Sequence, residues 1–342
     1  MNRMQKIVKA IGNGIARALR GIVPIRGDSR REWIRKITFL AALAVFLCSG
    51  YYLMDEMYLQ PQHTQEVTSS MRDLYIHGET DGIDAEEVPE DIVYPEGLKD
   101  SFKALYARNP DIAGWLTFKT TGAEDLFEGT VDNPVVQAAD NDKYLDIDFL
   151  GNKDKAGTLF FDSRNDLTKP DEERNLIIYG HNLKSGLMFS KFNLLVSQNV
   201  QRARTLETLT LDTPYGDKIT YKVFAVMIVD ADATGSAAFD YIRTEFSNDT
   251  QFSAFISNIR ARSLYDFGDV DVTAEDQLLT LSTCSNKKDT TLKNGRTIIV
   301  ARRLREGESA AVDEFKTVKN EDVLMPKAWY VNQELALPER YQ

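Results

Sequence analysis

The sequence predicts a mostly β protein with peripheral helices, in which one N-terminal transmembrane helix precedes a closed or nearly closed eight-stranded β-barrel. Three observations lead to this class. An uncharged apolar run lies near the N-terminus, short apolar runs separated by Asn, Asp, Gly and Pro dominate from residue 112 onward, and helical apolar stripes are few. With 342 residues and 43% hydrophobic content, the chain can bury a large core.

The charge of the chain is unevenly distributed. The formal net charge is −11, yet residues 1–36 carry ten basic and two acidic side chains. Residues 37–342 therefore carry a net charge of −19. An acidic main body argues against nucleic acid as a partner, and the asymmetry indicates that the two parts of the chain face different environments.

The boundary between these parts is the run ITFLAALAVFLCSGYYLM, Ile37–Met54, which contains no charged residue. Its 18 residues span about 27 Å as a helix, close to the thickness of a bilayer's hydrocarbon core. Basic residues dominate 30–36, whereas Asp55 and Glu56 follow the run, so we expect a cytoplasmic N-terminus and an extracellular main body. A cleaved signal peptide is disfavoured because residues 51–54 lack the small residues of a cleavage site.

The anchor divides the chain into segments of different composition. The N-terminal segment combines basic residues with an apolar helical stripe, which fits either the inner leaflet of the membrane or a solvated tail. The segment after the anchor is rich in acids and poor in periodic apolar positions, as expected of a stalk. The predicted segments are a basic cytoplasmic segment at 1–36, the anchor at 37–54, an acidic extracellular stalk at 55–96, a folded domain at 97–306 and a C-terminal extension of unknown role at 307–342.

Within the folded domain, two helices and eight strands are predicted. The stretch LKDSFKALYARNP predicts a short helix that ends at Asn109. A second helix has four apolar residues on one face, namely Phe252, Phe255, Ile256 and Ile259. The predicted strands are 112–118, 134–137, 158–161, 175–180, 206–211, 218–229, 277–284 and 296–304.

Two residues offer nucleophilic chemistry. The chain has two cysteines, and because Cys48 lies within the predicted anchor, Cys284 has no disulfide partner in the extracellular part. Of three histidines, only His181 falls within the predicted folded domain. Cys284 ends the apolar run QLLTLSTC and His181 ends NLIIYGH, so both can lie at a barrel rim as a nucleophile and its acid–base partner. Structural roles for both residues remain open on these counts alone.

No metal or cofactor is predicted. A metal site needs three or four ligands, and the sequence has no CxxC motif, no HExxH motif and no histidine cluster. A glycine-rich phosphate loop is also missing from the sequence.

Several motifs resemble those of a known family. The segment TLSTC followed by GRTIIVARR, with YGHN about a hundred residues earlier, resembles the sortases, which are membrane-anchored cysteine transpeptidases of Gram-positive surfaces. The stretches NPDIAGWLTF, NPVVQAADNDKYLDIDFLGNKDKAGTLFFDSRN and YGHNLKSGLMFSKF are similar to class B in particular. The resemblance covers about residues 98–305, and the extension that follows is no part of the family core that we can place.

The resemblance implies a reaction and its partners. Cys284, as a thiolate, would attack the carbonyl of a threonine in the C-terminal sorting signal of a surface protein, and His181 would protonate the departing amine. An amine of a peptidoglycan cross-bridge or of a pilin lysine would then resolve the thioester. Similarity to class B points to a signal of the Asn-Pro-x-Thr kind, with a specificity loop around residues 240–270.

An arginine is expected to stabilise the oxyanion. The candidates are Arg296, Arg302, Arg303 and Arg305. If residues 285–295 connect an antiparallel pair of strands, Cys284 and Arg296 face each other across the mouth of that loop. Arg302 shares the face of Arg296 but lies about 20 Å farther along the strand. We therefore expect Arg296 to act and the other three arginines to be solvated surface charges.

Three other functions remain open at the level of sequence. A pilin-polymerising sortase of similar fold would differ only in the amine that it accepts. Another cysteine acyl-transferase or protease would use the same nucleophile. A non-catalytic surface binding module would tolerate replacement of Cys284 without loss of function.

Overall fold

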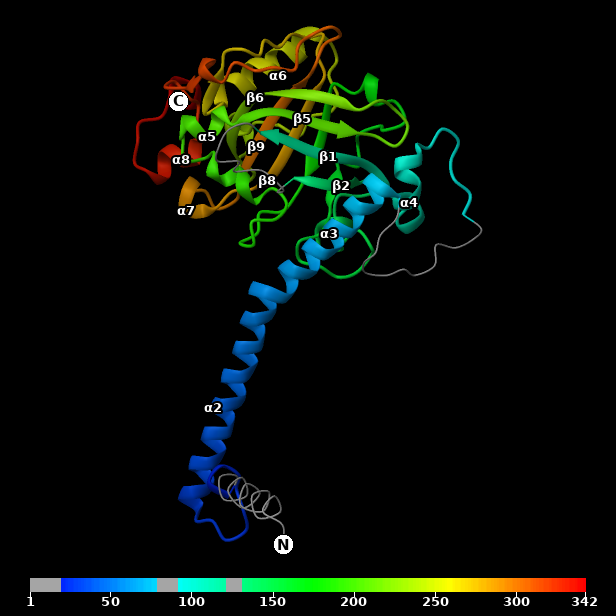
Figure 1. The fold of residues 1–342 in the computed structure, drawn as a ribbon. Coiled ribbons are helices and arrows are strands. Elements are labelled where there is room, and N and C mark those ends of the chain that lie inside the picture. The colour runs from blue at the N-terminus through cyan, green and yellow to red at the C-terminus, as the bar shows by residue number, and fades with distance from the viewer. Residues whose placement is uncertain (1–19, 79–91, 121–130) are drawn as a thin grey trace. The chain divides into compact units, whose positions relative to one another are not determined.

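The computed structural model describes residues 20–78, 92–120 and 131–342. The chain divides into two units, residues 1–60 and residues 61–342. Most of the basic amphipathic stretch and most of the acidic run of the predicted stalk lie outside the described residues, which are drawn as a coloured ribbon in Figure 1.

The first unit contains helix α2, Arg30–Met54, which continues into a π-helical turn over Asp55–Leu59. Ser29 caps the helix, because its hydroxyl accepts a hydrogen bond from the Glu32 N–H while the Glu32 carboxylate accepts one from the Ser29 N–H. The described part of the chain holds one helix that is long and apolar enough to cross a membrane or to serve as an N-terminal signal sequence. The predicted anchor falls within it.

Helix α3, Gln60–His77, corrects the predicted start of the folded domain. The sequence places these residues in the stalk, because apolar positions are sparse among them. The few that exist are spaced about one helical turn apart and are buried, namely Val67, Met71 and Leu74. They belong to the same apolar cluster as Trp115 of the barrel. The packed unit therefore begins near Pro61 rather than at residue 97.

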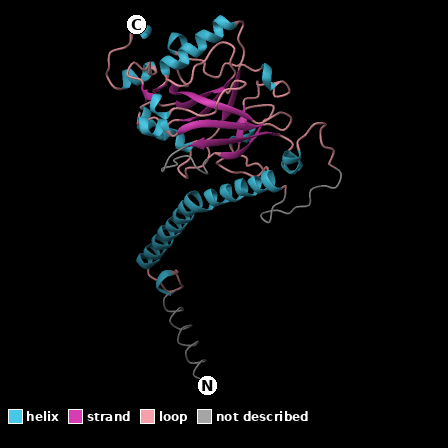
Figure 2. Cartoon of the chain, turned by 45° about the horizontal axis from the view of Figure 1, so that its top comes forward, coloured by secondary structure: helices cyan, strands magenta, loops and turns pink. Residues whose placement is uncertain are grey.

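Eight strands close into a barrel, shown in Figure 1 and in magenta in Figure 2. They are β1 (Ile112–Thr120), β2 (Asp132–Val136), β3 (Leu159–Phe161), β4 (Asn175–Tyr179), β5 (Leu206–Asp212), β6 (Ile219–Asp230), β8 (Leu278–Cys284) and β9 (Gly295–Arg303). Around the barrel they follow the order β1-β2-β3-β4-β8-β9-β6-β5. The predicted eight-stranded barrel is confirmed, and each predicted strand overlaps one of these eight.

Two of the strand pairs are parallel, and one of them builds the site. Strand β2 runs parallel to β3, and β4 runs parallel to β8. In the second pair Tyr179 lies opposite Ser282, so β4 and β8 end at the same edge of the barrel. A parallel pair requires a long crossover, and here the chain between β4 and β8 supplies β5, β6 and helix α6 (Asp249–Arg262).

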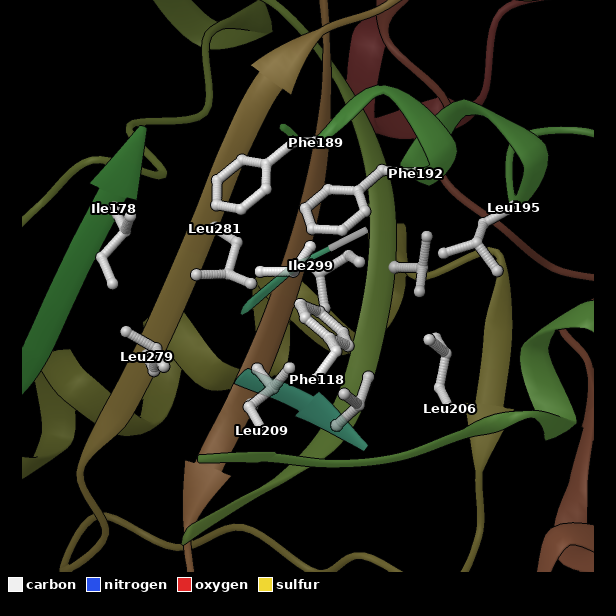
Figure 3. Close-up of a cluster of buried hydrophobic side chains, with 14 of the residues drawn as sticks. Phe118, Ile178, Phe189, Phe192, Leu195, Leu206, Leu209, Leu279, Leu281 and Ile299 are labelled. Atoms are coloured by element: carbon white, nitrogen blue, oxygen red, sulfur yellow. The ribbon is translucent and has the colours of Figure 1, made fainter. Parts of the chain in front are cut away.

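The barrel is filled with apolar side chains (Figure 3). Ile178 of β4, Leu281 of β8 and Ile299 of β9 point into the same cluster from neighbouring strands. Phe189 and Phe192, which follow β4, stack at 4.5 Å between ring centroids and cover this end of the core. The segment that follows β4 is thus packed against the core through two fully buried aromatic rings.

The helices flank the barrel. Helix α4, Asp100–Arg108, is followed by its C-cap residue Asn109, where the sequence predicts the end of the helix. All four apolar residues of the predicted stripe on α6 are buried, which confirms the second helix. The short helices α5 (Val200–Arg204) and α7 (Lys287–Thr290) lie in the connections that follow β4 and β8.

The C-terminal extension is packed on the domain. Its strand β10 (Thr317–Lys319) pairs with β7 (Tyr265–Phe267) in a small antiparallel sheet that the sequence did not predict. Met325 and Tyr341 are buried, and the Tyr341 hydroxyl donates to the Met325 carbonyl at 3.0 Å. Helix α8 (Lys327–Asn332) lies near α7 in Figure 1, and Asn332 donates to the Thr291 carbonyl at 2.8 Å.

Candidate active site

The nucleophile candidate and the arginine candidate are neighbours on adjacent strands. Cys284 is the last residue of β8 and is exposed. In the antiparallel pair of β8 and β9, its direct partner is Arg296. The guanidinium of Arg296 is half-buried and donates through Nη1 to the Asn294 side chain at 2.5 Å and to the Gly295 carbonyl at 3.1 Å. The predicted juxtaposition of these two residues is confirmed.

His181 follows the strand on the other side of β8. The Gly180 N–H donates to the Ser282 carbonyl at 3.1 Å, which continues the parallel ladder by one residue. Counting along both strands then brings His181 level with Cys284. The barrel topology therefore gathers all three predicted site residues at one edge, although 103 positions separate the histidine from the cysteine in the chain.

The imidazole of His181 is oriented by a backbone carbonyl. Its Nε2 lies 2.6 Å from the carbonyl oxygen of Leu145. Because a carbonyl oxygen only accepts hydrogen bonds, Nε2 must carry a proton, and Nδ1 is the ring nitrogen left for proton exchange. This carbonyl belongs to the last residue of the short helix Lys143–Leu145.

The residue before His181, Gly180, lies where the core leaves no space for a side chain. A Cβ atom at this position would lie 2.5 Å from Leu159 Cδ2 and 2.7 Å from Phe189 Cδ2. Both neighbouring side chains are buried at 5% exposure or less, so they cannot easily move aside. Only glycine fits here without displacing the core or the chain before His181.

Side-chain amides tie the connecting loops to the nucleophile. Asn182 donates to the Cys284 carbonyl at 2.9 Å and to the Asn286 side chain at 3.1 Å. Asn193 reaches the same carbonyl at 3.4 Å, while its own side-chain oxygen accepts from the Thr297 hydroxyl at 3.1 Å. The sequence analysis did not single out Asn193. Asn193 lies next to aromatic residues in the stretch FSKFNL. A polar side chain that is buried there must find hydrogen-bond partners, and this requirement could have identified Asn193 from the sequence.

Tyr241 is a further residue of the site that the sequence analysis missed. It is buried, and its hydroxyl lies 3.2 Å from the Ser282 hydroxyl, two residues before the nucleophile. Burial raises the pKa of Tyr241, while the Ser282 hydrogen bond and the nearby charge of Arg296 oppose that rise. Tyr241 therefore stays protonated, and its neutral hydroxyl group lies near the Cys284 thiol and the Arg296 guanidinium. It falls within the predicted specificity loop at 240–270.

A buried carboxylate, Asp162, supports the segment that carries Tyr241. Asp162 has no exposed surface and accepts three hydrogen bonds from Arg164, two from the guanidinium at 2.8 and 2.7 Å and one from the backbone N–H at 3.0 Å, and one from the Tyr179 hydroxyl at 2.7 Å. Burial alone would raise the pKa of Asp162, but these hydrogen bonds outweigh it and hold the pKa below its ordinary value. Arg164 also donates to the Ile242 carbonyl at 2.9 Å. Through Arg164 and Asp162, the segment that carries Tyr241 is therefore linked to Tyr179 of β4.

The prediction that the other arginine candidates are solvated surface charges was wrong for Arg302, whereas Arg303 is half-buried and Arg305 is exposed. Arg302 is fully buried, and its two Nη atoms donate to Glu308 at 2.6 and 2.7 Å. Arg303 pairs with Asp171, and Arg305 pairs with Asp271 and Asp276. Strand alternation shows which residues share a face, but it does not reveal that the segment after β9 folds back to cover that face. In the register of the strands Arg302 lies opposite Leu278, far from Cys284.

The described residues contain no group of three or more His, Cys, Asp or Glu side chains that could hold a metal ion. What the edge of the barrel does offer is a thiol, an imidazole with one fixed N–H, a guanidinium and a set of amide donors. This combination suits nucleophilic attack on a carbonyl and proton transfer to a leaving group.

Comparison with known proteins agrees with this geometry. Residues 129–304 match the family model for the sortase domain. Sortase B of Listeria monocytogenes is 29% identical over 270 residues, which are 79% of this chain and 96% of that protein. The structure of Bacillus anthracis sortase B matches with a TM-score of 0.55 at 27% identity, covering 73% of this chain and 100% of that one. A substrate complex of Staphylococcus aureus sortase B matches with a TM-score of 0.50 at 28% identity, covering 62% and 88%.

Proposed function

Because the chain belongs to the sortase family, and within it to class B, we propose that it cleaves a C-terminal sorting signal of surface proteins after threonine and transfers the protein to a peptidoglycan amine. One observation carries this proposal. Cys284 and Arg296 are direct partners on β8 and β9, and His181 is level with them beyond the end of β4. A solved structure of the Staphylococcus aureus relative is a sortase B–substrate complex, which supports a sortase substrate for this chain.

In the first half-reaction the Cys284 thiolate attacks the threonine carbonyl. The charge that develops on the carbonyl oxygen is stabilised by Arg296, which supplies several N–H donors at constant charge. The C–N bond then breaks, and the departing amine takes the proton from Nδ1 of the His181 imidazolium. The Leu145 carbonyl, which accepts from Nε2, stabilises that imidazolium and holds its orientation.

In the second half-reaction an amine resolves the thioester. The acceptor nitrogen attacks the acyl carbon, its proton passes to Nδ1 of His181, and the C–S bond breaks to restore the thiolate. The product is a new amide bond between the surface protein and the acceptor.

The location of this reaction follows from the N-terminal helix. We infer that residues 37–54 form an uncleaved anchor, with residues 1–36 in the cytoplasm and the barrel outside the cell. The basic residues before the apolar run and the acids after it support this orientation.

Replacement of the nucleophile tests the proposal. Cys284→Ala should abolish both cleavage of an Asn-Pro-x-Thr peptide and the acyl-enzyme mass observed by intact-protein mass spectrometry. The fold should survive, because the thiol is exposed and contributes little to packing. Cys48→Ala is the matched control and should keep full activity. A Cys284→Ala protein that cleaves at the wild-type rate would contradict the covalent mechanism.

A further inference from the structure

A cavity of about 350 Å³ is lined by residues that include Asn182 and Asn193, whose side chains hydrogen-bond the backbone carbonyl of Cys284. Its walls come from the chain that follows His181 and from the loop that follows Cys284. The lining residues that matter for its chemistry are Asn182, Lys184, Lys191, Arg202, Asn286 and Asp289. We refer to it as the cationic pocket. Its volume is in the range of sites that take a few residues of a peptide.

The pocket is coupled directly to the catalytic strand. Asn182 forms part of its wall and donates to the Cys284 carbonyl at 2.9 Å. Asn286, another lining residue, accepts from the same amide at 3.1 Å. A ligand in the pocket therefore contacts side chains that hold the backbone of the nucleophile itself.

The net charge of the pocket lining is positive, whereas that of the whole chain is negative. Among the residues that the structure describes, three cations line it against one acid, Asp289, in a protein with a net charge of −11. Neither Lys184 nor Lys191 forms an ion pair with any residue that the structure describes. Lys287 and Lys288, both exposed, lie between Asn286 and Asp289 in the sequence and add to the positive potential.

A transpeptidase must seat two substrates in succession at one thiol. Tyr241 borders the nucleophile from the segment between β6 and α6, through its contact with Ser282. The cationic pocket borders it from different elements, the β4–β5 connection and the β8–β9 loop. The acyl chain and the incoming acceptor can therefore approach Cys284 along separate surfaces.

Resting on the function proposed above, we propose that the cationic pocket binds the carboxylates of the acceptor, so that the preferred acceptor is an acidic peptide bearing a free amine. Lysine ammonium groups are compact and mobile, which suits the carboxylates of a flexible peptide. Arg202 is already engaged through Nη1 with the Leu194 carbonyl and Ser197, so it shapes the wall of the pocket while the two lysines supply adaptable charge.

The test compares acceptors that differ only in charge. The full-length protein in detergent micelles is given a fluorescent Asn-Pro-x-Thr donor peptide and one of two acceptors. Both acceptors begin with the same free-amine triglycine, and they end in Glu-Glu or in Gln-Gln-amide. A second pair offers a lysine side-chain amine with the same two endings. The readout is the ratio of kcat/KM for the acidic acceptor to that for the neutral acceptor.

We expect the wild-type ratio to exceed one and to fall as ionic strength rises, because the pocket is open to solvent. Lys184→Gln/Lys191→Gln should reduce the ratio by about three- to tenfold, as expected for the loss of two exposed ion pairs, chiefly through the KM for the acidic acceptor. The control Lys103→Gln removes an exposed lysine of α4 that pairs with Asp100, and it should leave the ratio unchanged.

Three outcomes would overturn the inference. They are equal use of both members in each acceptor pair, an unchanged ratio in the double variant, and a double variant whose KM rises for the donor peptide instead. The assay without acceptor keeps this failure separate from that of the proposed function. If the wild-type protein does not cleave the donor peptide at all, the transpeptidase proposal itself fails.

Discussion

Replacing Glu308 by Gln measures how much the buried ion pair near the end of β9 stabilises the domain. Arg302 has no exposed surface and donates twice to this carboxylate. Lys222, whose side chain is 5% exposed, donates to the same carboxylate at 3.0 Å. Glutamine keeps the shape of the side chain but removes the charge, so two buried cations would face a neutral amide.

The expected loss follows from burial. Removing one partner of a buried pair costs about 3–5 kcal/mol of unfolding free energy. Because the Glu308 side chain is 24% exposed, water can replace part of its interaction, and we expect a value near the lower end, about 3 kcal/mol. With an unfolding entropy of about 2.1 cal/mol/K per residue, that loss lowers Tm by about 5 °C for a unit that spans residues 61–342.

Urea unfolding followed by tryptophan fluorescence measures this loss, since Trp115 is buried in the core. The matched control is Glu306→Gln, which makes the same chemical change at an exposed site two residues earlier. Equal unfolding free energies for the two variants would refute the reasoning, because the charge of Arg302 would then be satisfied without Glu308.

The same pair makes a pH prediction. The hydrogen bonds from Arg302, opposed in part by burial, hold the pKa of Glu308 far below its ordinary value. A depressed pKa contributes stability that is complete above the pKa of the unfolded state, about 4.3 for Glu, and is lost as pH falls toward the folded pKa. The difference in unfolding free energy between the wild type and Glu308→Gln should therefore be constant near neutral pH and shrink below about pH 4.

Three further predictions concern the site and its location. Arg296→Ala should lower kcat by about a hundredfold or more and Arg296→Lys should restore little of it; near-wild-type turnover by the alanine variant would exclude the oxyanion role. Gly180→Ala should cost about 1–3 kcal/mol by overpacking against Leu159 and Phe189 and should also reduce turnover, and an unchanged Tm in a thermal melt would contradict the steric argument. Protease added to intact protoplasts should digest the barrel, which should stay with membranes after a high-salt wash; a mature N-terminus near residue 50 would indicate a cleaved signal instead.

The strands were predictable because each is a short apolar run closed by turn residues. The run NLIIYGH, for example, ends with Gly180 and His181, and a side chain at Gly180 would clash with Leu159 and Phe189. The juxtaposition of Cys284 and Arg296 was predictable for a related reason, since an 11-residue connection between two apolar runs favours an antiparallel pair. Local pattern was sufficient wherever the partners are close in sequence.

Long-range packing was not predictable in the same way. The polar sequence of α3 shows only a thin apolar stripe, and nothing local indicates that it meets Trp115. The extension after residue 306 has few apolar residues, yet Met325 and Tyr341 are buried in it. The hydrogen bond from Asn182 to the Cys284 carbonyl depends on the parallel pairing of β4 with β8, which no periodicity reveals.

The mixed topology of the barrel also bears on the order in which the site assembles. The β8–β9 hairpin closes a short loop, so the entropy of closure is small and Cys284 can meet Arg296 early in folding. His181 reaches the thiol only when β4 docks along β8, across about a hundred intervening residues. Chains that have not completed this step hold a thiol and a guanidinium without an acid–base partner. Catalytic competence should therefore appear in refolding experiments as the slowest signal, after the recovery of secondary structure.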